Sequence, residues 1–275
     1  MPETIPSHLQ TLADRLDRLM AAPTERPTFV YLDIIGIGWP IHCLLHLAGV
    51  DYDFVRVSLL EWTARSPEGG FVLKSRVRNG HLPLFVDGDL RLNQSNVILA
   101  YLAERYDLFG DGPDERLAAM EVMAHAYDSL FHWNGMLPVN ATVNVPDDVA
   151  KDRLAAFLGE GVWGISNDGY RNHLDGFLRY LEANPKKSGF MVGDRLSVAD
   201  LHAFNALANW YKAFDRTVFS TEYPALDDYI ERIATIPAVA DYIRNHQEPT
   251  TWLPYPGVGI ALTTPEEIAG LTSVR

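Results

Sequence analysis

Residues 81–95 read HLPLFVDGDLRLNQS, and this stretch decides the fold. An apolar run follows Pro83, and it ends at Asp87-Gly88, a strong signal for a two-residue hairpin turn. Residues 90–92 predict the returning strand. Ser95 is placed to cap a helix, because an apolar pattern at helical spacing begins directly after it. The stretch therefore predicts a strand that starts at a proline, a tight turn, a second strand and a capped helix.

The same stretch predicts a binding site for an extended, acidic ligand. A proline at the start of a strand donates no hydrogen bond to the sheet, and in a tight turn it is often cis. A cis bond before Pro83 leaves the backbone N–H and C=O of Leu82 facing outward, free to pair with a peptide-like ligand. The helix N-terminus at Ser95 suits a carboxylate. Together these features predict a socket for an acidic peptide.

This arrangement resembles the glutathione-binding half of the cytosolic glutathione S-transferases. In that family the residue before a cis-proline pairs with the cysteinyl backbone of glutathione, and a Gln/Glu-Ser pair at the next helix binds the γ-glutamyl carboxylate. The resemblance implies that Leu82, Pro83, Gln94 and Ser95 hold glutathione, which would be the co-substrate.

Tyr31 is the candidate catalytic residue. Residues 28–33 are rich in β-formers and predict the first strand. The resemblance is to the tyrosine-type enzymes, nearest to the sigma-like classes, in which a tyrosine at this place acts on glutathione. A phenol O–H donated to the sulfur stabilises the thiolate, whose free thiol has a pKa of ~8.5. The other branch uses Ser or Cys just after this strand, and residues 32–41 contain neither. A purely structural strand aromatic is the alternative.

The resemblance implies further glutathione contacts. Trp62 and Lys74 resemble residues that approach the glycyl end of glutathione. Ile37 stands where related enzymes often have arginine, and His81 stands where they often have glutamine. Either His81 donates to the ligand or it is a surface loop histidine. Lys74 has a sound role opposite a carboxylate, and a solvated lysine is the alternative.

The order of predicted elements defines the fold class. Residues 28–107 predict a thioredoxin-like βαβ-ββα domain, with a helix over 40–48, a second strand over 52–60 and an extended loop over 61–80. A Gly- and Asp-rich segment, 108–113, reads as a linker. Helical periodicity then continues through 113–247, which predicts an all-helical domain. The fold class is therefore α/β plus all-α. Residues 1–27 predict an N-terminal helical extension, and 248–275 form a C-terminal tail.

The helical part carries a second sharp motif. Ser197 and Asp200 are three residues apart at a predicted helix start, a capping box with Asp in place of Glu. The family has this box, whose role is folding. Further helices are predicted over 114–133, 149–158 and 169–181, the first with an apolar face made by Leu117, Met120, Met123 and Tyr127.

The resemblance also implies roles for side chains of this first long helix. Asp128 is the match for an acidic residue that reaches across the dimer to the glutathione amine. An exposed helical aspartate is the alternative. The electrophile would be held by apolar side chains near the first strand and along this helix, with ordinary core packing as the alternative: Ile34, Tyr127, Phe131 and Trp133.

Composition excludes several classes of function. The formal charge is −13 and no block of Lys and Arg stands out, so neither nucleic acid nor an anionic membrane is expected as a partner. The single cysteine, Cys43, excludes an intrachain disulfide and a multi-cysteine zinc site, and it reads as a buried packing residue. His42 and His46 lack a third ligand, so no metal is expected. No secretory signal or long apolar run is present, and we expect a cytoplasmic protein.

The predicted function is glutathione transfer to a small apolar electrophile by conjugation, ether or halide displacement, or isomerisation. The family commonly forms dimers, so a homodimer is expected. The alternative from another class is a non-catalytic carrier of hydrophobic ligands or an assembly module built on the same fold. A thioredoxin-like redox enzyme would need an exposed cysteine within residues 34–41, which contain none. The segment 36–38, Gly-Ile-Gly, does not complete a dinucleotide fingerprint.

Overall fold

The computed structural model describes residues 5–34, 36–136, 170–213 and 220–245, and the side chains of 131–136, 170 and 209–213 are outside that description. The chain divides into two compact units. The first comprises Met1–Ile34 and Gly49–Ile98, and the second comprises Ile35–Ala48 and Leu99–Arg275. The predicted helix over 149–158 and the tail over 248–275 lie outside the described residues.

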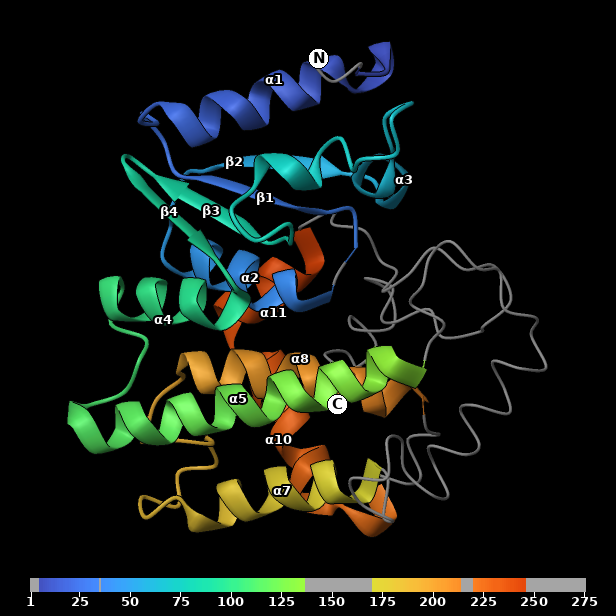
Figure 1. The fold of residues 1–275 in the computed structure, drawn as a ribbon. Coiled ribbons are helices and arrows are strands. Elements are labelled where there is room, and N and C mark those ends of the chain that lie inside the picture. The colour runs from blue at the N-terminus through green and yellow to red at the C-terminus, as the bar shows by residue number, and fades with distance from the viewer. Residues whose placement is uncertain (1–4, 35, 137–169, 214–219, 246–275) are drawn as a thin grey trace. The chain divides into compact units, whose positions relative to one another are not determined.

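The first unit is built on a four-stranded mixed sheet with the order β2-β1-β3-β4 (Figure 1). Strand β2 runs parallel to β1, whereas β3 is antiparallel to both β1 and β4. This confirms the thioredoxin-like arrangement. The bounds are Thr28–Leu32 for β1, Asp53–Val57 for β2, Leu84–Asp87 for β3 and Leu90–Asn93 for β4.

The two faces of this sheet are packed differently. Alternate residues of the strands form one apolar cluster with α1 (Ser7–Ala21), which lies across that face (Figure 1). Helix α1 lies within the predicted N-terminal helical extension, and its leucines join this core. The opposite face carries a group of aromatic side chains. Phe29 stacks on Tyr31 at 5.8 Å and on Phe54 at 5.9 Å between ring centroids.

The segment after β2 differs from the prediction. The strand ends at Val57, and Ser58 caps a short helix, α3 (Leu59–Thr63). The Glu61 N–H donates to Ser58 Oγ at 3.2 Å, and the Ser58 N–H donates to Glu61 Oε2 at 2.8 Å. This reciprocal box satisfies two helix donors and ends the apolar run as a helix. The predicted strand end and part of the extended loop were therefore wrong, since a 3₁₀ turn, η2 (Lys74–Arg76), also interrupts the loop.

The hairpin is present, with its turn one residue later than predicted. Asp87 pairs with Leu90 in the ladder, so Gly88 and Asp89 form the turn. Gly88 has φ of 56°, in the left-handed region that glycine tolerates without steric cost.

The second unit is helical. Helix α8 (Val198–Ala213) packs against α5 (Gly112–Met136), α2 (Trp39–Leu47) and α10 (Pro224–Thr235), and α5 and α8 lie side by side (Figure 1). Trp39 contacts Phe204 and Tyr242 at ring-centroid distances of 5.4 and 5.6 Å. The remaining helices are α7 (Tyr170–Ala183), α11 (Pro237–Asn245) and most of α4 (Ser95–Arg105), and η1 (Gly36–Gly38) precedes α2. Cys43 in α2 is fully buried, as predicted.

The buried face of α5 is not the predicted one. Leu117 and Met120 are 66% and 52% exposed, whereas Met123 is buried. Two alanines and a valine, Ala119, Val122 and Ala126, share the buried side with Met123. Small side chains let two helices approach closely, so the packing selected a stripe of small residues over the larger apolar ones.

The predicted box at Ser197 and Asp200 is confirmed, and it extends beyond the helix start. Asp200 Oδ2 accepts from the Ser197 N–H at 2.9 Å and from Ser197 Oγ at 2.8 Å. Its Oδ1 accepts from the Met191 N–H at 2.8 Å and from the Tyr229 hydroxyl at 3.2 Å. Asp200 is fully buried, so one carboxylate joins α8, α10 and the preceding loop.

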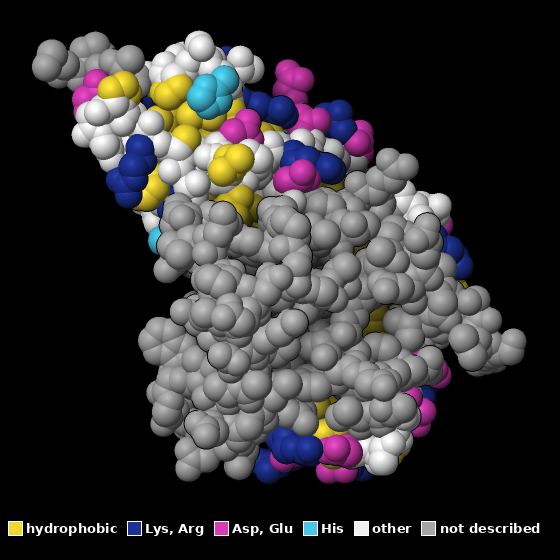
Figure 2. Space-filling model, turned by 90° about the vertical axis from the view of Figure 1, so that its right-hand side faces the viewer, with side chains coloured by type: hydrophobic (Ala, Val, Ile, Leu, Met, Phe, Trp, Pro, Cys, Tyr) yellow, Lys and Arg dark blue, Asp and Glu magenta, His cyan; other side chains and the backbone are white. Residues whose placement is uncertain are grey.

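Two surface properties bear on partners. Among the described residues, no helix is both long and apolar enough to cross a bilayer. On the face in Figure 2, side chains of both charge signs are interspersed where described residues are visible.

Candidate functional site

The register of the sheet brings part of the predicted site, Tyr31, Pro83 and Ser95, to one end of β1. The Leu82–Pro83 bond is cis, as predicted. Val30 pairs with Leu84, so the next positions along β1 and β3 are Tyr31 and Pro83. Leu84 also pairs with the last residue of β4, so the chain enters α4 at Ser95 beside this same end. The sheet thus places the catalytic candidate near the segment predicted to hold the ligand backbone.

Asn93 holds this segment, and the sequence analysis missed it. Its side-chain Nδ2 donates to the carbonyl of His81 at 3.2 Å and to that of Pro83 at 3.1 Å. One amide therefore ties both sides of Leu82, which is half-buried, to the end of β4. A polar residue at a strand end, opposite a proline segment, was the available signal.

The start of α4 departs from the predicted cap. The helix begins at Ser95 itself, so Ser95 is not its N-cap. Gln94 precedes it with φ of 76°, a conformation that is costly for a residue with a Cβ. Ser95 is 1% exposed, and within the described part of the chain its Oγ has no hydrogen-bond partner. A buried hydroxyl beside free helix N–H groups fits an anionic group of a ligand.

His81 is exposed and its ring is oriented by its neighbour. His81 Nδ1 lies 2.6 Å from the carbonyl oxygen of Asn79, so Nδ1 carries the hydrogen and donates. In the neutral ring this leaves Nε2 as an acceptor. The predicted donation to a ligand would therefore require the protonated ring.

Trp62 and Lys74 lie in different surroundings. Trp62 is 5% exposed and belongs to the apolar cluster beneath α1. Lys74 is half-buried, with Nζ 4.1 Å from the centroid of the Phe71 ring. Arg65 Cζ is 4.0 Å from the same centroid. Phe71 therefore holds two cations near one ring, a cluster that the sequence analysis did not single out.

The remaining candidate residues are divided between the two units. Ile34 is buried at the end of the sheet unit. On α5, Tyr127 is half-buried and Asp128 is exposed. Phe131 and Trp133 fall within α5, but their side chains lie outside the described residues.

The two histidines of α2 do not converge on a common ligand site. His46 Nε2 lies 3.1 Å from a carboxylate oxygen of Asp241 on α11. His42 is buried within α2. Among the described residues, no group of three metal-ligating side chains comes together.

Comparisons with known proteins match both parts of the chain to one family. The family model described as "Glutathione S-transferase, N-terminal domain" matches residues 27–104, and the corresponding C-terminal domain model matches 166–246. Glutathione S-transferase P 1 of Bufo bufo is 30% identical over 171 residues, which cover 62% of this chain and 72% of that protein. Glutathione S-transferase P 1 of Xenopus laevis is 27% identical over 215 residues, 78% of this chain and 90% of that protein.

Solved structures show the same fold. The crystal structure of the glutathione S-transferase from Ascaris lumbricoides aligns with a TM-score of 0.63 at 24% identity, covering 83% of this chain and all of that one. With a thioredoxin-like sheet unit and a helical unit, the molecule has the two-domain transferase fold. The chain therefore belongs to the glutathione S-transferase family, whose activity it carries with glutathione as co-substrate.

Proposed function

We propose that Tyr31 is the catalytic residue of this transferase, in the manner of the tyrosine-type, sigma-like enzymes. One observation supports the proposal: the β1–β3 pairing ends at Val30 and Leu84, so Tyr31 and Pro83 are the next residues of the two segments, at the sheet end where α4 begins. A thiol held by the backbone of Leu82 would lie next to the phenol of Tyr31.

The surroundings of Tyr31 suit thiolate stabilisation. Its side chain is 4% exposed and stacks on Phe29. A hydroxyl donor acts more strongly on an anion in such low-dielectric surroundings than in water. Each unit by which it lowers the thiol pKa corresponds to ~1.4 kcal/mol of preference for the thiolate. The thiol proton leaves to solvent.

The reaction then needs no further redox partner. The sulfur electron pair forms a bond to an electrophilic carbon. In a displacement, a leaving group departs with the electrons of the broken bond. In an addition to an activated double bond, the sulfur bonds to one carbon of that bond and the other carbon takes up a proton. Isomerisation is the third option, in which the sulfur bond later breaks again. The electrophile would contact the apolar candidates Ile34, Tyr127, Phe131 and Trp133.

Glutathione would be held along its length by this chain's own groups. The Leu82 backbone would pair with the cysteinyl unit. Ser95 Oγ and the first N–H groups of α4 would take the γ-glutamyl carboxylate, which gives the buried hydroxyl its partner. Gln94 would bind beside them. Lys74 and Trp62 would approach the glycyl end, and His81 would contact the ligand near Leu82.

A homodimer is also part of the proposal. Leu117, Met120 and Asp128 are all exposed and lie on one side of α5, since 11 residues make about three helical turns. Exposed apolar residues in such a stripe are typical of an interface. In a dimer formed there, Asp128 would be carried to the partner's glutathione amine. We expect the enzyme to act in the cytoplasm.

The test is a pH titration of bound glutathione followed by thiolate ultraviolet absorbance, in the wild type, Tyr31→Phe and Tyr52→Phe. Tyr52 precedes β2 at the opposite end of the sheet, so it is a matched control. We expect the wild type and Tyr52→Phe to lower the thiol pKa by about one unit or more, and Tyr31→Phe to leave it near ~8.5. A lowered pKa in Tyr31→Phe, or an unshifted one in the wild type, would overturn the assignment.

A further inference from the structure

The helical unit contains a cavity that is lined by none of the residues proposed for the transferase site. It has a volume of about 610 Å³ and lies between α5, α7 and the loop 184–193. Ala118 on α5 and Ala183 on α7 are the small residues that line it, whereas at Gly176 the His125 ring of α5 packs directly against α7. The volume falls within the ~300–1,000 Å³ typical of small-molecule sites.

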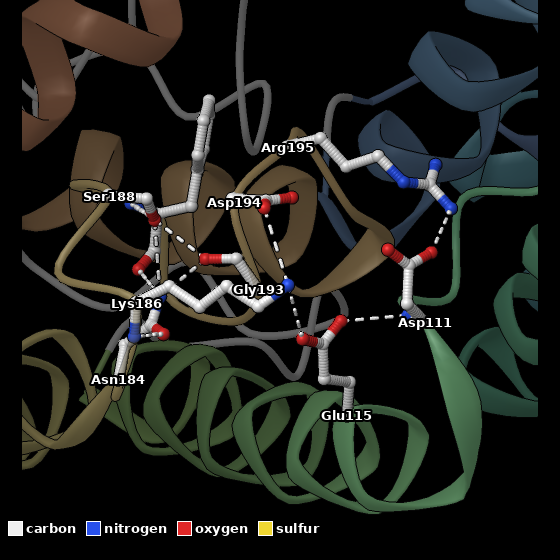
Figure 3. Close-up of polar contacts among 9 residues, drawn as sticks. Asp111, Glu115, Asn184, Lys186, Ser188, Gly193, Asp194 and Arg195 are labelled. Carbon is white, nitrogen blue, oxygen red and sulfur yellow. Dashed lines mark hydrogen bonds and ion pairs between the residues drawn. The ribbon is translucent and has the colours of Figure 1, made fainter.

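The wall of the cavity is fixed by hydrogen bonds. Asn184 Nδ2 donates to the carbonyls of Phe190 at 2.9 Å and Gly193 at 2.8 Å, and Ser188 Oγ donates to the Gly193 carbonyl at 2.6 Å (Figure 3). The loop then presents buried Met191 and Val192 to the cavity. A preformed apolar wall lowers the entropic cost of binding, because little has to be ordered when a ligand enters.

The charged groups at the cavity are mainly acidic: Asp114, Glu115 and Glu121 against Arg179. Glu115 is already engaged. Its carboxylate accepts from the Asp111 N–H at 2.7 Å and lies 3.4 Å from Lys186 Nζ, which also contacts Asp194 at 3.2 Å (Figure 3). Lys186 therefore compensates the negative charge of Glu115 and also binds Asp194 of the loop.

Glu121 keeps its negative charge uncompensated. Its side chain is exposed, and the group beside it is the neutral Tyr180 hydroxyl, whose pKa is raised by burial and by the charge of Glu121. Within the described residues, neither Glu121 nor Asp114 has a cation within ion-pair distance. His125 adds no positive charge at neutral pH, since burial lowers its pKa and outweighs the opposing effects of the His173 carbonyl and Asp128. The cavity thus combines an apolar wall, an aromatic ring and an excess of carboxylate.

We propose that this cavity binds a protonated amine that carries an aromatic or alkyl body. The ammonium group would contact the Glu121 carboxylate and the Tyr180 ring, which attracts a cation through its π-face. The apolar body would lie against Val122 and Met191. Arg179 disfavours a second cation, so a monoamine fits better than a polyamine.

The test compares three naphthyl probes of equal size by calorimetric titration: naphthylethylamine, naphthylethanol and naphthylacetate. We expect the amine to bind the wild type about tenfold more tightly than the neutral alcohol, and the anionic acid to bind most weakly. Glu121→Gln should remove the advantage of the amine and leave the alcohol unchanged. Glu182→Gln, an exposed carboxylate of α7 outside the cavity lining, should keep the advantage.

A second pair of variants tests whether the probes bind in this cavity. Ala118→Phe should fill the cavity and abolish binding of both amine and alcohol, whereas Ala225→Phe, at an exposed position of α10, should not. Thermal unfolding of each variant reports that it is folded. Equal affinity for amine and alcohol, tightest binding of the acid, absence of amine binding, or amine binding that survives both Glu121→Gln and Ala118→Phe would overturn the proposal. Glutathione transfer is measured separately and does not enter this test.

Discussion

Two helices in this molecule have a buried serine at their start, and the two serines differ in their hydrogen bonds. Ser95 opens α4 in the sheet unit, and Ser197 precedes α8 in the helical unit. Both side chains are buried, at 1% and 2% exposure. Ser197 Oγ donates to Asp200 within its own helix start, whereas Ser95 Oγ has no partner in the described part of the chain. A buried polar group that the fold satisfies serves stability, whereas an unsatisfied hydroxyl at a helix N-terminus fits the ligand contact proposed for Ser95.

The largest effect is expected from removing the carboxylate of Asp200, which accepts the hydrogen bonds at the start of α8. Asp200→Ala leaves the buried donors of Ser197, Met191 and Tyr229 without their carboxylate. Each such loss costs about 1–3 kcal/mol, so we expect a total loss of roughly 3–5 kcal/mol in the free energy of unfolding. Urea-induced unfolding at neutral pH measures it.

Asp194→Ala is the matched control in the same loop. Its carboxylate is exposed and pairs with Lys186, so its removal should cost roughly 0–1 kcal/mol. If Asp200→Ala cost no more than this control, the carboxylate would not be the centre of the helical unit that its bonds indicate.

Asp200 and His202, both buried on α8, are expected to affect stability in opposite ways as the pH changes. Burial raises the pKa of Asp200 to about 6 from an ordinary 3.8, against the lowering effect of its hydrogen bonds. Burial lowers the pKa of His202 from 6.5 to about 3. The Asp200 contribution to stability is therefore lost as pH rises through about 6. The His202 contribution is present above pH 6.5 and is lost as pH falls.

Between about pH 4 and pH 6 these two slopes oppose each other, and each amounts to ~1.4 kcal/mol per pH unit. His202→Leu should leave the Asp200 slope alone, so its stability relative to the wild type should rise by ~1.4 kcal/mol for each pH unit of acidification in this window. Urea midpoints across the window test this, with exposed His8→Leu as control. Parallel curves for His202→Leu and wild type would contradict the opposing slopes.

Ser95→Ala tests whether the serine at the start of α4 binds glutathione. We expect the KM for glutathione to rise about tenfold, because one hydrogen bond to a carboxylate is lost. Stability should stay constant or increase by about 1 kcal/mol, since a buried hydroxyl without a partner is removed. Ser197→Ala should do the reverse, with a loss of about 1–2 kcal/mol in stability and an unchanged KM. A Ser95→Ala enzyme with normal KM and lower stability would make both serines structural.

The sequence predicted those elements in which local and long-range preferences agree. The hairpin, the cis bond at Pro83, helix α2 and the box at Ser197 all carry short-range signals that the packing also favours. Helix α3 was missed although its signal was present, since Ser58 and Glu61 have the spacing of a capping box. There the β-formers of β2 dominated the interpretation.

What sequence reasoning could not supply depends on contacts between distant residues. Ser at a helix start predicts a cap, and only the placement of α4 shows that Ser95 is inside the helix and unsatisfied. Leu117 and Met120 fit a helical apolar face, yet the close approach of α8 selected smaller residues. The clamp by Asn93 follows from strand register, which composition does not encode.

The smallest expected effect concerns Gln94, which precedes Ser95 and has a φ of 76°. A left-handed conformation costs a residue with a Cβ about 1–2 kcal/mol, and glycine avoids that cost. Gln94→Gly should therefore raise the free energy of unfolding by about 1 kcal/mol, partly offset by the flexibility of glycine in the unfolded chain. If the strained backbone is kept because the side chain binds glutathione, the same variant should raise the KM for glutathione while kcat changes little. A Gln94→Gly enzyme that is more stable and has an unchanged KM would show that this helix start, like the one at Ser197, is purely structural.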